Sequence, residues 1–146
     1  MAFLACACAT NNPVRQEVVL LDGNVPEANC YTAVLPDDSS VHSYMLLLPG
    51  FGESVEDVLE AADLPRKAAE AGIAVFILTL QDGIESYGFS KESQQTLSAI
   101  AEDIVRKYSF ADKPYCIGGF SMGGAAAVRY AEATLEKPIT ESPDSH

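Results

Sequence analysis

One serine in the sequence is flanked by glycines in a pattern typical of a catalytic nucleophile. The segment Gly119-Phe120-Ser121-Met122-Gly123 has the spacing G-x-S-x-G, and it lies between a short apolar run and an alanine-rich segment. In this pattern the serine stands on a sharp turn between a strand and a helix, where only small residues fit two positions away on either side. The pattern therefore predicts that the Ser121 hydroxyl attacks an acyl carbonyl.

Backbone amides near Ser121 are expected to stabilise the negative charge that this attack creates. The amide of Met122 lies at the positive end of the helix that follows the serine. A second donor is expected from the loop Pro-Gly-Phe-Gly at residues 49–52, which also joins an apolar strand to a helix. Gly50 and Gly52 allow amides in this loop to turn inward, and Phe51 is the predicted donor. The alternative interpretation is a tight strand-to-helix turn with no further role.

The elements that must position these residues follow from the hydrophobic pattern. Continuous apolar runs predict buried strands over residues 44–48, 73–80 and 115–118, because strands covered on both faces do not alternate. Helices are expected over residues 55–62, 63–72, 91–108 and 122–135, and an antiparallel hairpin over 17–21 and 30–35. This order predicts a three-layer α/β fold: a mostly parallel sheet of about five strands with helices on both faces.

In this order of elements, residues 44–133 resemble the first half of an α/β-hydrolase of the serine esterase and lipase type. The hairpin matches the first two strands of that family. The resemblance implies that Ser121 is the nucleophile, that Phe51 and Met122 provide the oxyanion hole, and that the loop 81–90 borders the pocket. It also implies a small-molecule acyl substrate, such as a carboxylic ester, and neither a metal ion nor an organic cofactor. It does not name one substrate, because this fold carries many activities.

The catalytic base is the part of the family pattern that this chain lacks. A serine hydroxyl needs a hydrogen-bonded base, and the family places its acid and histidine after the serine. His42 precedes the strand 44–48 and is expected at the far end of the sheet, whereas His146 stands in a polar tail. Two hypotheses remain: a serine hydrolase whose sequence is incomplete here, or a catalytically silent remnant that binds a ligand or a protein partner.

The same comparison predicts an open sheet edge. In the family, further strands follow beside the strand 115–118, and that segment contains no charged residue or proline that would protect a free edge. We therefore expect self-association through this strand.

Composition narrows the remaining function classes. The 146 residues include 21 acidic and 9 basic side chains, a formal net charge of −12, and 48% are hydrophobic. Such a charge repels nucleic-acid phosphates, so a nucleic-acid partner is not expected. No apolar run approaches the length that crosses a bilayer. The four cysteines lack the spacing of a zinc site.

The chain divides into three predicted parts. Residues 1–14 form an N-terminal segment, residues 15–136 the partial hydrolase domain, and residues 137–146 a polar tail. The first eight residues resemble the end of a bacterial lipoprotein signal, although no Lys or Arg precedes Arg15. Two locations therefore remain open: the cytoplasm, or export with a lipid anchor.

Overall fold

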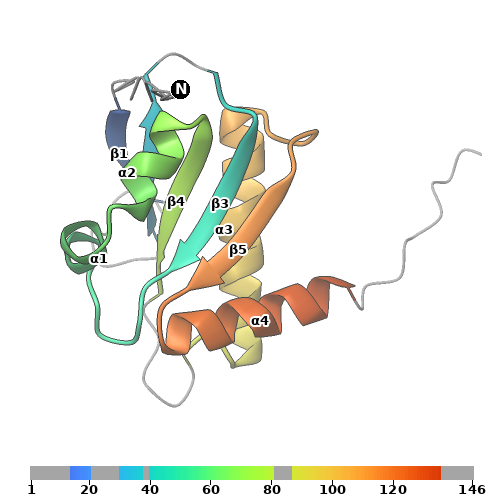
Figure 1. Cartoon of the computed structure of the whole chain (residues 1–146). Coiled ribbons are helices and arrows are strands. Elements are labelled where there is room, and N and C mark those ends of the chain that lie inside the picture. The colour runs from blue at the N-terminus through green and yellow to red at the C-terminus, as the bar shows by residue number, and fades with distance from the viewer. Residues whose placement is uncertain (1–13, 21–29, 38–39, 81–86, 136–146) are drawn as a thin grey trace, which may run out of the picture.

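A computed structural model describes residues 14–20, 30–37, 40–80 and 87–135 of the chain (Figure 1). In chain order the elements are β1 (Val14–Leu20), β2 (Cys30–Pro36), β3 (Ser43–Leu48), α1 (Val55–Ala61), α2 (Leu64–Glu70), β4 (Ile73–Thr79), α3 (Lys91–Tyr108), β5 (Tyr115–Gly119) and α4 (Met122–Leu135). The predicted α/β order is confirmed. No helix in the described ranges is long and apolar enough to cross a membrane.

The strands form one sheet in the order β1-β2-β4-β3-β5. β3 pairs in parallel with both β4 and β5. β1 pairs with β2, and β2 with β4, in antiparallel register. The expectation of a mostly parallel sheet is therefore partly wrong, because half of the pairings are antiparallel. The physical reason is the hairpin: it reverses β2, and β2 then borders the parallel strands directly.

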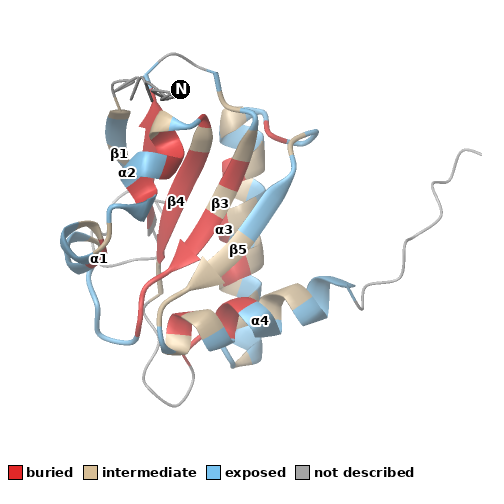
Figure 2. Cartoon of the chain, viewed as in Figure 1, coloured by how far each residue is buried: buried red, intermediate tan, exposed pale blue. Residues whose placement is uncertain are grey.

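Helices cover both faces of this sheet, as the sequence predicts. On one face Leu97, Ile100 and Ile104 of α3 pack with buried side chains of β2, β3 and β4, such as Phe76. On the other face Ala68 and Ala69 of α2 pack with residues of β2 and β4. Figure 2 shows that β4 is largely buried and that β5 is more exposed, and residues 31–36 of β2 are all buried as well. The core therefore lies around the inner strands.

α3 is also tied to the hairpin by two tyrosines. The Tyr31 hydroxyl on β2 donates to Asp103 Oδ2 at 2.9 Å, and the Tyr108 hydroxyl donates to Glu17 on β1. Burial, followed by these hydrogen bonds to carboxylates, raises the pKa of both tyrosines. The bond from Tyr108 lowers the pKa of Glu17. These contacts join segments that are more than 70 residues apart in sequence.

β5 is an edge of the sheet within the described residues. Tyr115 is 44% exposed although it stacks on Tyr44, and Cys116 is exposed. The chain therefore presents an uncharged edge strand to solvent, as the sequence predicts. Self-association through it stays a prediction.

Candidate active site

Ser121 lies at the turn between β5 and α4, and its backbone is strained. Its φ is 49°, in the left-handed region that residues other than glycine rarely adopt. Ser109 at the end of α3, with φ 58°, is the only other non-glycine residue with positive φ in the described ranges. Ser121 is exposed, one residue before the first turn of α4. The serine therefore lies in an exposed position just beyond the end of β5.

Two glycines allow this turn to sit close to its neighbours. A Cβ on Gly119 would lie 2.4 Å from the carbonyl carbon of Gly123, in the first turn of α4. A Cβ on Gly123 would lie 2.2 Å from the carbonyl oxygen of Pro49 and 2.4 Å from that of Leu48. Side chains at either position would push α4 away from the ends of β3 and β5. The spacing of glycines around Ser121 therefore has a steric cause.

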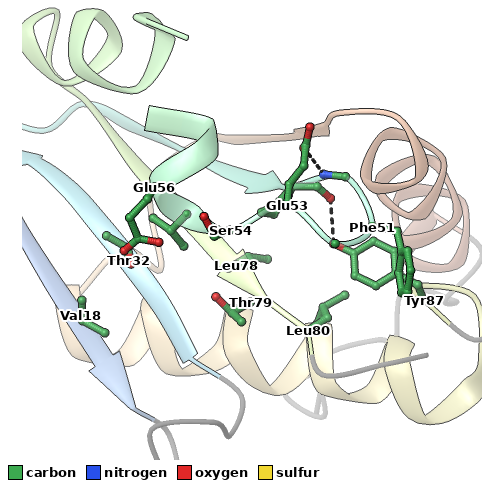
Figure 3. A pocket seen from close by; sticks show the side chains of 14 residues that line it. Val18, Thr32, Phe51, Glu53, Ser54, Glu56, Leu78, Thr79, Leu80 and Tyr87 are labelled. Atoms are coloured by element: carbon green, nitrogen blue, oxygen red, sulfur yellow. Dashed lines mark hydrogen bonds between the residues drawn. The ribbon is translucent and has the colours of Figure 1, made fainter. Parts of the chain in front are cut away.

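The loop after β3 lies beside this turn and is held by several contacts. The Phe120 amide donates to the Leu48 carbonyl at 3.0 Å. The Gly50 amide donates to Glu53 Oε2 at 2.7 Å, and the Glu53 amide returns to the Gly50 carbonyl at 3.1 Å (Figure 3). Gly52 has a φ of 80°, which the tight turn requires. The loop is therefore a closed turn rather than an extended segment.

Tyr87 supports the same loop from the segment before α3. Its buried hydroxyl donates to the Pro49 carbonyl at 2.7 Å, and its ring meets that of Phe51 edge to face with centroids 5.7 Å apart. Phe51 itself is 41% exposed. The predicted lining loop 81–90 thus contributes Tyr87, while residues 81–86 lie outside the described residues.

Both predicted oxyanion donors are open. In the described ranges, neither the Phe51 amide nor the Met122 amide has a hydrogen-bond acceptor in the protein. Met122 is the first residue of α4, where helical amides lack an intrahelical partner. Free amides near a serine are the groups that an oxyanion hole requires.

The site contains no histidine among the described residues. His42 lies just before β3, where its Nε2 donates to the Ala71 carbonyl at 2.9 Å. Ser121 follows β5, which runs parallel to β3, so the length of the sheet separates the two residues, roughly 20 Å at 3.3 Å per residue. His42 is exposed and lies at the far end of the sheet, where the sequence predicts it. His146 lies outside the described residues.

A cavity of about 540 Å³ opens on the other side of the loop (Figure 3). Gly50, Phe51 and Gly52 line it, but Ser121 and Met122 do not. Its remaining wall comes partly from the hairpin, through Val18 and Thr32. Sequence reasoning missed these two residues, because nothing in a local pattern shows that the hairpin reaches the loop across β4.

The acidic residues at the start of α1 have different roles. Ser54 and Asp57 form a reciprocal cap, in which the Asp57 amide donates to Ser54 Oγ and the Ser54 amide to Asp57 Oδ2. These bonds lower the pKa of Asp57. Glu53 instead binds the Gly50 amide, and Glu56 lines the cavity. Glu53 therefore closes the turn of the loop, whereas Asp57 caps the helix.

Comparison with known proteins gives matches in structure only. No protein family and no curated protein matches the chain in sequence. The fluorophosphonate-binding serine hydrolase FphF of Staphylococcus aureus matches with a TM-score of 0.70 and 17% identity, over 86% of this chain and 54% of that chain. An esterase of Pyrobaculum calidifontis matches with a TM-score of 0.64 and 18% identity, over 87% of this chain and 42% of that chain.

A third similar structure is a putative carboxylesterase of Lactobacillus plantarum, with a TM-score of 0.63 and 21% identity, over 85% of this chain and 51% of that one. The chain thus spans about half the length of the structures it matches. At these identities the likeness concerns the fold. The chain has an α/β-hydrolase-like fold over most of its length.

Proposed function

We propose that this chain carries the nucleophile and the oxyanion hole of a serine hydrolase that cleaves a carboxylic ester or a related acyl compound. The observation that carries the proposal is the left-handed Ser121, held at a strand-to-helix turn beside two unpartnered amides. Backbone strain of this kind persists only where the surrounding structure enforces it, and it clusters at functional sites. The esterases and serine hydrolases of the same fold support the reaction class.

The proposed reaction begins when Ser121 Oγ forms a bond to the acyl carbon. The carbonyl oxygen gains negative charge and accepts hydrogen bonds from the Phe51 and Met122 amides, and the serine proton passes to a base. The alcohol then leaves with a proton, and water releases the acid from the acyl-serine. No described residue is placed to act as the base. The proposal therefore assigns the base to a group outside the described residues.

A second candidate function rests on that same observation. Without a base near Ser121, the fold would be a catalytically silent remnant that binds a ligand or a protein partner. Removal of one triad member leaves about 10³–10⁴-fold catalysis over water in a serine hydrolase, so weak turnover alone does not separate the two candidates. A direct test of the serine does.

The test is covalent labelling of the full chain with a fluorophosphonate probe, in which the serine oxygen displaces fluoride from phosphorus. Ser121→Ala is compared with Ser109→Ala, which makes the same change at the other left-handed serine. We expect the wild type and Ser109→Ala to be labelled and Ser121→Ala to remain unlabelled. Labelling that persists in Ser121→Ala, or a folded wild type that is not labelled, would overturn the proposal; the latter result favours the silent remnant.

A further inference from the structure

The peptide plane between Pro49 and Gly50, at the start of the oxyanion loop, is held at both ends. Its carbonyl oxygen accepts the Tyr87 hydroxyl at 2.7 Å, and its amide donates to Glu53 Oε2 at 2.7 Å (Figure 3). Tyr87 is buried, and its ring packs against that of Phe51. Because a peptide unit is planar, this one cannot rotate without losing both hydrogen bonds.

The next peptide plane carries the predicted oxyanion donor. Its carbonyl, that of Gly50, accepts the Glu53 amide at 3.1 Å. The described peptide bonds are all trans, so the N–H of each plane points opposite to the carbonyl. The Phe51 N–H therefore points away from the Glu53 amide. Glu53 thus holds both planes, the first through its carboxylate and the second through its backbone, and it occupies the Gly50 amide while that of Phe51 stays open.

The segment that carries Tyr87 is itself anchored to two helices. The amide of Gly88 donates to the buried Ser93 Oγ of α3 at 2.8 Å. A Cβ on Gly88 would lie 2.1 Å from the Cβ of Ala126, so this segment also packs closely against α4. Met122, the other predicted donor, begins the same helix. Tyr87 therefore connects the helix of one donor with the loop of the other.

We propose that Tyr87 and Glu53 are positioning residues, which fix the direction of the Phe51 amide without touching the substrate. The inference rests on the proposed function, in which this amide stabilises the oxyanion. An oxyanion donor acts because its direction is set before the reaction, and the loss of one donor slows catalysis by about 10²–10³-fold. Without the Tyr87 hydroxyl or the Glu53 carboxylate, the first plane can turn, and the Phe51 amide turns with it.

The first test measures this direction without any reaction. Residual dipolar couplings of the backbone N–H bonds report their orientation in the full chain. Tyr87→Phe keeps the ring beside Phe51 and removes only the hydroxyl. Tyr31→Phe is the matched control, because it removes a hydroxyl that donates to Asp103 at 2.9 Å, from a residue that does not contact the loop. We expect the Phe51 coupling to change in Tyr87→Phe and to stay at the wild-type value in Tyr31→Phe.

The second test separates the Glu53 hydrogen bond from the Glu53 charge. Glu53→Ala removes both, whereas Glu53→Gln keeps an oxygen that can accept the Gly50 amide. Glu53 is exposed, so neither variant disturbs the core. Glu60→Ala is the control, since it removes the same charge from an exposed position on α1. The Phe51 coupling should change in Glu53→Ala and return to the wild-type value in Glu53→Gln.

Fluorophosphonate labelling then connects this direction with the reaction. The phosphoryl oxygen of the probe takes the place of the oxyanion, so a misdirected donor slows the covalent step. We expect Tyr87→Phe and Glu53→Ala to lower the maximal labelling rate about tenfold, with the half-saturating probe concentration unchanged. Glu53→Gln, Tyr31→Phe and Glu60→Ala should label at the wild-type rate.

A Phe51 coupling that is unchanged in both Tyr87→Phe and Glu53→Ala would overturn the proposal. A changed coupling with an undiminished maximal labelling rate would do so as well, and so would an equal loss in Glu60→Ala. A wild type that is not labelled overturns the proposed function instead, and the couplings alone then decide whether these two residues direct the amide.

Discussion

Gly123→Ala tests whether α4 must touch the end of β3 for the site to exist. The new Cβ would lie 2.2 Å from the Pro49 carbonyl oxygen, whereas ordinary contact begins at 3.4 Å. The backbones must therefore separate by more than 1 Å, and neither neighbour is a flexible side chain. Overpacking of this kind costs about 1–3 kcal/mol, and we expect the upper end because both partners are main chain. Gly118→Ala is the control, since nothing lies within 4 Å of its Cβ position.

Thermal and denaturant unfolding measure this difference. Unfolding entropy is about 2.1 cal/mol/K per residue, so for a chain of 146 residues a loss of about 3 kcal/mol lowers Tm by roughly 10 °C. Gly118→Ala should change stability by about 0.5 kcal/mol or less. Fluorophosphonate labelling should fall in Gly123→Ala, because the Met122 amide moves with α4. Equal Tm values for the two variants would refute the steric account of the elbow.

Three further outcomes are expected. Ser121→Gly should stabilise the chain by about 1 kcal/mol in urea unfolding, because it removes the side chain from a residue with a left-handed backbone, and it should abolish labelling. An unchanged or lower stability would contradict the conclusion that the backbone of Ser121 is strained. Stability should fall as pH rises above 10, the ordinary pKa of tyrosine, since Tyr31 and Tyr108 stay neutral in the folded chain while they ionise in the unfolded one; the double variant to Phe should weaken this dependence in CD-monitored melts, and the part that remains belongs to Tyr44 and Tyr130, whose pKa values burial also raises. The β5 edge should support self-association, and Cys116→Lys should yield a monomer by sedimentation; a wild type that is already monomeric argues against that edge.

Local patterns predicted the helices well because each pattern carries its own boundaries. α3 spans residues 91–108 as expected, with Ser90 as its N-cap and a left-handed Ser109 at its end. Local patterns predicted the strands of the sheet but not all of their pairings. The hairpin itself is local, but the pairing of β2 with β4 joins segments about 45 residues apart, so this neighbour follows from the strand order of the α/β-hydrolase family that the sequence resembles and not from a local residue pattern.

The candidate site divides in the same way. Gly119 and Gly123 could be predicted because the pattern around Ser121 is typical of a turn that leaves no room for side chains at these two positions. Thr32 could not, because its place in the cavity depends on how the hairpin registers against β4. The role of Glu53 also escaped prediction, since its bond to Gly50 depends on the turn at Gly52 rather than on the helix that follows.

The strand order also governs when the chain can fold during synthesis. β4 lies between β2 and β3, yet it is made after both, so β3 has no neighbouring strand on either edge until later residues appear. Until Thr79 has been made, the apolar residues of β3 have only the hairpin and the two short helices to pack against. Non-local pairing of this kind is slow and exposes aggregation-prone surface. We expect nascent chains that stop before β4 to need chaperones, and the sheet to assemble only once that strand inserts.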